Sequence, residues 1–66
     1  MTKELITERW LQIFDKKPIS IVHDYNNIWI VETPDIYLEQ MEKLDEFFEL
    51  HEISSSKSGL YIVVEV

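Results

Sequence analysis

The chain has 66 residues, of which 45% are apolar and 29% are charged, and it contains no cysteine. This length allows one small domain and excludes multidomain enzymes and full dinucleotide-binding folds. The lack of cysteine excludes disulfides and thiolate zinc sites. The formal net charge is −7, opposite in sign to that of most nucleic-acid-binding domains. We therefore expect one folded domain over residues 1–66 that binds no nucleic acid directly.

Neither a secretory signal nor a membrane span is visible in the sequence. Charged residues interrupt the first ten positions, and the longest apolar run, Leu60 to Val64, is far shorter than the roughly 20 residues that cross a membrane. We expect a soluble cytoplasmic protein, of a bacterium or of an infected host cell, that makes no contact with a membrane.

Residues 3–16 are expected to form a helix, because their apolar side chains recur at steps of three and four. These side chains are Leu5, Ile6, Trp10, Ile13 and Phe14. Thr2 is the expected N-cap of this helix. The alternating segment 19–25 and the apolar segment 28–32 follow as two strands of a hairpin, joined by an asparagine turn.

Thr33-Pro34-Asp35 predicts the start of a second helix, with Thr33 as the cap and Pro34 as the first helical residue. This helix extends to about Phe48. Its expected core stripe consists of Tyr37, Met41, Leu44 and Phe48. Segments 49–54 and 60–66 then form a second pair of strands, joined by a serine-rich loop.

The order helix, strand, strand occurs twice and predicts an α+β fold. We expect an αββαββ two-layer sandwich in which both helices cover one face of a four-stranded antiparallel sheet. The most apolar strands, 28–32 and 60–66, belong at the centre of the sheet, and strands 19–25 and 49–54 belong at its edges. This is the order of a ferredoxin-like domain in which one terminal strand is permuted.

The two halves of the chain are also similar to each other at an offset of 33 residues. Leu11 then meets Leu44, Phe14 meets Phe47, and five of the 33 pairs are identical. A duplicated helix–hairpin unit explains this match, but two unrelated amphipathic units of equal length would align in the same way. Both explanations stay open.

The surplus of negative charge lies in residues 32–52, where eight acidic residues accompany a single basic one, Lys43. Helical spacing places most of them on one side of the second helix, with Asp45 at the margin. The residues that we expect to bind a partner are Asp35, Glu39, Glu42, Asp45, Glu46 and Glu49. Like charges at this spacing destabilise a helix by roughly 0.2–0.5 kcal/mol per pair, and a merely solubilising surface would contain more lysines. A solvated surface nevertheless remains the common alternative.

Trp29 is the other candidate contact residue. In one register Ile28 and Ile30 face the helices, and Trp29 and Val31 lie on the open face of the sheet, where an apolar patch is typical of a partner surface. In the other register Trp29 lies in the core and the isoleucines are exposed. The sequence leaves both registers open.

No arrangement typical of catalysis is visible, and we expect no enzymatic activity and no catalytic residue. Gly59 is the only glycine, which excludes glycine-rich phosphate loops, and the acidic residues lie on an open helix rather than in a desolvated cleft. The two histidines, His23 and His51, lack metal-ligand spacing and are expected to be half-buried at the sheet edges. We therefore expect no metal and no cofactor.

These features favour a small acidic protein-binding module, a stoichiometric inhibitor or regulator that docks its acidic helix on a basic partner surface. Rows of carboxylates can imitate the phosphates of DNA, and small phage inhibitors are similar in size and charge, although no motif supports that comparison. The alternative is a homodimeric structural domain that packs through the sheet face around Trp29 and Val31 or through the edge strand 19–25. A sensor of small ligands is a third candidate, but it needs a pocket that the sequence does not reveal.

Overall fold

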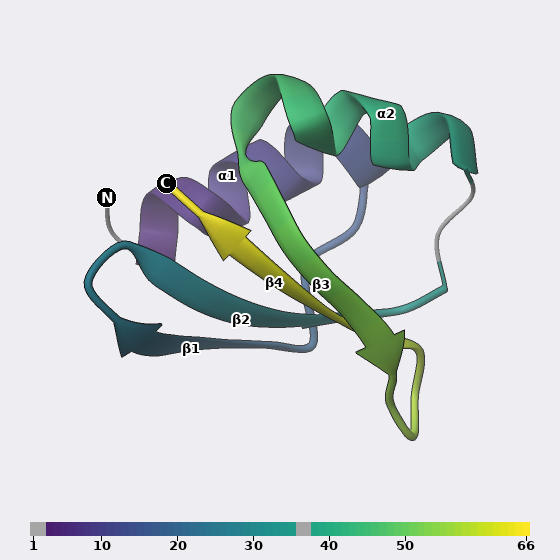
Figure 1. Ribbon diagram of the computed structural model, residues 1–66. Helices are drawn as coiled ribbons and strands as arrows, with labels where there is room; N and C mark the ends of the chain where they lie inside the picture. Colours follow the sequence, from purple (N-terminus) through teal and green to yellow (C-terminus); the bar gives the residue numbers. More distant parts are fainter. Residues whose placement is uncertain (1–2, 36–37) are drawn as a thin grey trace.

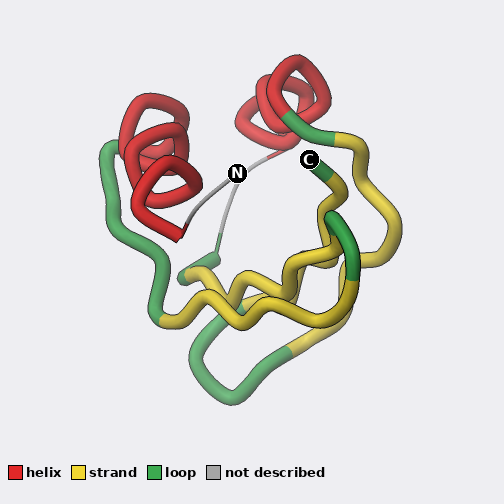
Figure 2. The backbone as a smooth tube through the Cα atoms, turned by 90° about the vertical axis from the view of Figure 1, so that its left-hand side faces the viewer, coloured by secondary structure: helices red, strands yellow, loops and turns green. Residues whose placement is uncertain are grey.

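The computed structural model describes residues 3–35 and 38–66. The elements in chain order are α1 (Lys3–Phe14), β1 (Ser20–Tyr25), β2 (Ile28–Thr33), α2 (Leu38–Phe47), β3 (Glu49–Ser55) and β4 (Leu60–Glu65). Both helices lie on one side of a curved, four-stranded antiparallel sheet (Figures 1 and 2). The expected α+β two-layer arrangement is confirmed.

The strand order of the sheet is β1-β2-β4-β3, so that β2 and β4 are central. Residues directly opposite each other on neighbouring antiparallel strands share a face of the sheet. Val31 lies between Ile21 and Ile62, and all three are buried beneath the helices. The next row, Val22–Ile30–Val63, therefore lies on the open face. The most apolar strands occupy the centre because their side chains are covered on one face and flanked on both edges.

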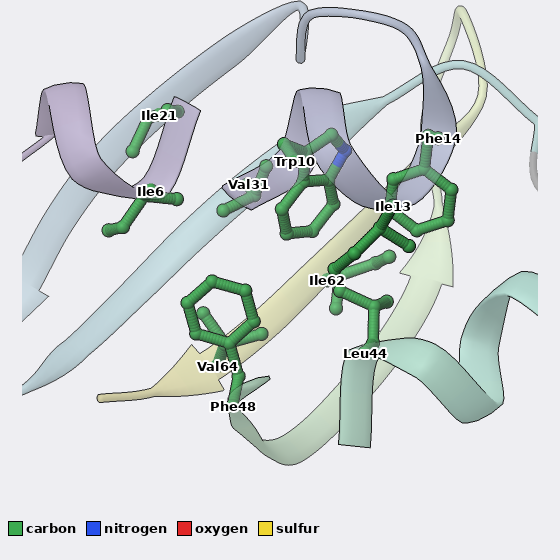
Figure 3. Packing of buried hydrophobic residues seen from close by; sticks show 10 residues of the cluster. All are labelled: Ile6, Trp10, Ile13, Phe14, Ile21, Val31, Leu44, Phe48, Ile62 and Val64. Atoms are coloured by element: carbon green, nitrogen blue, oxygen red, sulfur yellow. The ribbon is translucent and has the colours of Figure 1, made fainter. Parts of the chain in front are cut away.

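The hydrophobic core gathers side chains from both helices and from three strands (Figure 3). Its members are Ile6, Trp10, Ile13, Phe14, Ile21, Val31, Leu44, Phe48, Ile62 and Val64. Trp10 is fully buried, and its ring centre lies 5.2 Å from that of Phe14 and 6.0 Å from that of Phe48. Its Nε1–H donates a hydrogen bond of 3.0 Å to the Thr33 hydroxyl oxygen. Trp10 thus joins both helices to the end of β2.

Helix α1 ends at Phe14, two residues earlier than expected, because the chain turns at Asp15. Asp15 has a φ of 57°, and its N–H donates a hydrogen bond to the Leu11 carbonyl oxygen. A left-handed residue just after the last turn is a common way to end a helix, and aspartate tolerates this conformation better than most residues. The expected cap Thr2 lies outside the described residues.

The expected start of the second helix is wrong in its details. Thr33 is not a helix cap, because it continues β2 opposite Leu60 and its hydroxyl accepts the hydrogen bond from Trp10. Pro34 and Asp35 are not helical, and the described part of α2 begins at Leu38. The core stripe agrees with expectation where it is described: Met41 is half-buried, and Leu44 and Phe48 are buried. The expected stripe residue Tyr37 lies outside the described residues.

The loop between β3 and β4 packs closely against the end of β2. A Cβ atom added at Gly59 would overlap the Thr33 carbonyl oxygen and would lie 2.8 Å from Pro34 Cα. Because backbone atoms cannot withdraw as a flexible side chain can, this position requires a residue without a Cβ. The serine-rich loop is therefore anchored at its glycine.

Burial does not support the helix alignment at an offset of 33. That offset pairs buried Phe14 with exposed Phe47, whereas an offset of 34 pairs Phe14 with buried Phe48. In the central strands, Val31 and Val64 are both fully buried and do lie 33 residues apart. The number of residues between the helix and its hairpin is therefore one smaller in the second half of the chain than in the first. The duplication itself stays a prediction.

Replacing Thr33 with valine tests the hydrogen bond that joins α1 to β2. Thr33→Val keeps the shape of the side chain but leaves the Trp10 N–H buried without an acceptor, so the free energy of unfolding should fall by about 1–3 kcal/mol. Urea denaturation followed by circular dichroism measures this change. Thr33→Ser is the control, since it keeps the hydroxyl and should retain the interaction with Trp10. A valine variant as stable as the wild type would contradict a structural role for this bond.

Candidate functional site

Four exposed carboxylates on α2 form what we call the acidic surface. Its members are Glu39, Glu42, Asp45 and Glu46. Leu44, on the opposite side of the same helix, is fully buried against the core. Packing of that apolar side therefore points the carboxylates of Glu39, Glu42 and Glu46 to solvent, with Asp45 at the margin.

The acidic surface is not neutralised by the part of the chain that the structure describes. The single ion pair found among residues 3–35 and 38–66 joins His51 of β3 to Glu65 of β4 and includes no residue of α2. The Arg9 guanidinium of α1 lies 5.8 Å from the ring centre of Phe47 and 6.0 Å from that of Phe48, so it binds aromatic rings rather than carboxylates. Lys43 is the one basic residue of α2, and it is exposed.

The two flanking acids of the expected site lie outside the helix. Asp35 is exposed in the segment between β2 and α2. Glu49 was expected on the helical series, but it is the first residue of β3 and lies opposite Glu65. The helix ends before it because the Phe48 N–H makes the last helical hydrogen bond, to Leu44 O, while its ring is buried in the core. The placement of Glu49 on the helix is therefore wrong.

A shallow hollow lies at the corner where α2 passes into β3, and sequence reasoning did not identify it. Its lining consists of Asp45, Glu46, Phe47, Phe48, Glu49 and Leu50. Phe47 is 38% exposed there. Aromatic side chains, phenylalanine included, are enriched at protein–protein interfaces. The hollow thus adds an apolar contact to the edge of the acidic surface.

The strand register decides the position of Trp29. Trp29 lies opposite the core residue Val64 and packs against the hydrophobic core, so it faces the helices. Its ring also stacks on that of His23, with the ring centres 4.5 Å apart. Of the two registers that the sequence allows, the one with Trp29 on the core side is correct, but its isoleucines are not exposed as expected, because Ile28 is buried and Ile30 is half-buried. A contact between Trp29 and a partner stays a prediction.

The open face of the sheet has an apolar centre. Val22 is 54% exposed and Tyr61 is 39% exposed, while Ile30 and Val63 are half-buried in the same row as Val22. Glutamates interrupt this patch: Glu32 lies opposite Tyr61, and Glu52 lies opposite Val63. The face is therefore a small apolar patch bordered by negative charge.

Both histidines lie on edge strands, as expected, but both are exposed rather than half-buried. His23 on β1 donates a hydrogen bond of 2.7 Å from Nε2 to the Asn26 carbonyl oxygen. His51 on β3 lies beside two carboxylates, because its Nε2 is 2.7 Å from Glu65 Oε1 and Glu49 is next to both. Local sequence spacing could not identify this cluster, since Glu65 belongs to another strand.

Neither helix in the described ranges of the chain is long and apolar enough to cross a membrane. No family model, curated protein or solved structure matches the chain. The likeness to a permuted ferredoxin-like domain therefore stays a prediction, and a proposed function has to be based on the surfaces of the molecule itself.

Replacing Glu42 tests whether the acidic surface reduces the stability of the fold. Glu42 has acidic neighbours at three helical positions, namely Glu39, Asp45 and Glu46. Glu42→Lys turns these repulsions into attractions and should raise the free energy of unfolding by about 1 kcal/mol at low salt, with a smaller gain at high salt. Urea denaturation at both salt concentrations measures the gain.

The matched control for this prediction is Asp24→Lys, which changes the net charge equally at an exposed position far along the chain from α2. An equal gain in both variants would mean that only the net charge matters. No gain in the Glu42 variant would mean that the acidic residues of α2 do not repel one another measurably.

Proposed function

We propose that the protein is a small acidic binding module that docks its α2 surface on a basic surface of a partner protein and acts as a stoichiometric inhibitor or regulator. The observation that carries the proposal is the lack of any ion pair at the acidic surface within the described part of the chain. Four carboxylates that repel one another lower the stability of the free protein. A cationic partner would relieve that repulsion on binding.

The chemistry of the surface favours a partner with several arginine or lysine side chains in a row. The carboxylates of Glu39, Glu42 and Glu46 follow one another at steps of three and four residues, roughly one helical turn of about 5.4 Å. A groove that binds the phosphates of nucleic acid presents cations in such a row. Phe47, in the hollow beside Glu46, would add an apolar contact to the partner, which the phosphates of a nucleic acid could not make.

The proposal is tested with two variants that lose the same number of negative charges. The acidic-surface variant carries Glu39→Gln, Glu42→Gln, Asp45→Asn and Glu46→Gln. The control carries Glu4→Gln, Glu8→Gln, Asp15→Asn and Asp24→Asn, all at exposed positions outside α2. Wild type and both variants are immobilised and exposed to nuclease-treated lysate of the source cells. A protein retained by the wild type and the control, but not by the acidic-surface variant, is the expected result.

The retained protein is then purified and its affinity is measured against salt. We expect the affinity to fall at least about tenfold between 50 and 500 mM NaCl, because the distance over which charges interact shortens from about 14 Å to about 4 Å over this range. Competition by duplex DNA would identify the partner's nucleic-acid groove as the contact. Equal retention by the two variants, or an affinity independent of salt, would contradict docking through the acidic surface.

A homodimer formed through the open face of the sheet is the second candidate, with Val22, Ile30 and Val63 in place of the expected Trp29 and Val31, which face the helices. It is favoured by the row Val22–Ile30–Val63, where a large apolar side chain is more than half exposed. Glu32 and Glu52 border the patch, so two copies facing each other would bring like charges together. Salt should therefore strengthen this association, whereas it weakens docking of the acidic surface on a cationic partner.

Sedimentation equilibrium up to millimolar concentration tests the dimer. If the open face is the interface, the wild type should reach a dimer mass at high salt, and Val22→Ser should remain monomeric under the same conditions. Ile19→Ser serves as the control, because Ile19 is also an exposed apolar residue but precedes β1 and lies outside the row Val22–Ile30–Val63. A monomer mass for the wild type at every salt concentration would eliminate this candidate.

A further inference from the structure

Glu49, His51 and Glu65 form a cluster where β3 begins and β4 ends. We propose that this cluster binds a divalent transition-metal ion, such as Zn²⁺, through one imidazole nitrogen and two carboxylates. The proposal does not rest on docking through α2: none of the three residues belongs to the acidic surface, although Glu49 also lines the hollow beside Phe47.

Strand pairing and a β-bulge bring the three side chains together. Glu49 and Glu65 lie directly opposite each other on β3 and β4. The register shifts by one residue between Leu50 and Glu52, which makes His51 the extra residue of a bulge. Bulges redirect side chains that a regular strand would alternate between faces. Here the imidazole is directed to the carboxylate of Glu65.

The distances suit a shared ion after small side-chain rotations. His51 Nε2 lies 2.7 Å from Glu65 Oε1, and the three donor atoms all lie within 4.8 Å of one another. Donors bound to one zinc ion at about 2.0–2.2 Å are roughly 3–3.5 Å apart. The side chains of His51 and Glu65 are 42% and 40% exposed, and Glu49 is also exposed, so solvent leaves them free to rotate.

The negative charges of Glu49 and Glu65 also favour a bound cation. Two like charges directly opposite each other on neighbouring strands destabilise a sheet. His51 interacts with Glu65 through a single hydrogen bond, while a dication between the carboxylates would compensate both Glu49 and Glu65. An imidazole with two carboxylates is a donor set that suits zinc and its transition-metal neighbours, whereas magnesium prefers oxygen donors and retained water.

The surroundings leave room for the remaining ligands of an ion. A hollow next to the cluster is lined by Tyr25, Asn26, Asn27 and Ile28 of the β1–β2 turn, together with His51 and Glu65. Water can complete the coordination from this side, as it does at open zinc sites.

Calorimetric titration with ZnCl₂ tests the site, with His51→Gln and His23→Gln as a matched pair. His23 is the right control because it is also exposed on an edge strand, yet its Nε2 is bonded to a backbone carbonyl. We expect one zinc ion per chain, an affinity at least about tenfold lower for His51→Gln and for Glu65→Gln, and no change for His23→Gln. Equal affinities for all variants, or equal losses for both histidine variants, would overturn the proposal.

Two further measurements distinguish Zn²⁺ bound at this cluster from Zn²⁺ attracted only by the net negative charge of the protein. In proton NMR, Zn²⁺ should shift the ring signals of His51 and leave those of His23 in place, while the same concentration of Mg²⁺ shifts neither. The acidic-surface variant should bind Zn²⁺ as tightly as the wild type, although it has lost four negative charges. Loss of zinc binding in that variant would attribute the effect to net charge and would overturn the site without affecting the test of partner docking.

Glu49→Gln should change the melting temperature in a way that a cluster without a metal ion would not produce. With a chelator present, this variant should melt no lower than the wild type, because it removes one of two opposing like charges. With Zn²⁺ present, the wild type should gain more in melting temperature than the variant, because the variant has lost a ligand. An identical zinc-induced rise in both proteins would exclude Glu49 as a ligand and overturn the proposed three-ligand site.

Discussion

The buried Trp10 indole is the interaction on which the rest of the fold depends. A chain of this length without disulfides has little apolar area to bury, so one large side chain carries an unusual share of the core. Trp10 packs on Phe14 of its own helix, reaches Phe48 at the end of α2, and donates its N–H to Thr33 at the end of β2. Because these contacts fix the inner sides of both helices, they also determine that the carboxylates of α2 point to solvent.

Much of this arrangement could be predicted from the sequence, because it depends on local periodicity. The apolar steps in residues 3–14 and the apolar segments 28–32 and 60–66 suffice to identify α1 and the two central strands. The exposed acids of α2 follow from the same helical spacing. Predictions based on neighbouring residues failed where a side chain forms its hydrogen bond with a residue far away in the sequence. Thr33 reads as a helix cap, but Trp10, 23 residues earlier in the chain, uses its hydroxyl.

The cluster at Glu49 shows the other limit of sequence reasoning. A regular hairpin centred on the serine-rich loop would place Leu50 opposite Glu65, and the bulge at His51 brings Glu49 there instead. The positions of Glu49 and His51 therefore both depend on one extra residue in β3, and no local pattern marks that bulge. A shift of one residue reverses the face on which a side chain lies. The same sensitivity explains why the sequence left two positions for Trp29, which only the pairing with Val64 resolves.

The two groups of carboxylates differ in whether the chain itself compensates them. The fold forces Glu49 and Glu65 together across neighbouring strands, and His51 donates a hydrogen bond to one of them. On α2 no pairing constrains the solvent side, where lysines at the same spacing would stabilise the helix. Even so, that side carries four acids and one lysine, and the one arginine of the chain, Arg9 of α1, binds the aromatic rings of Phe47 and Phe48. This repulsion, which the fold does not require and which no ion pair of the described residues offsets, is the observation on which the proposed docking on a cationic partner rests.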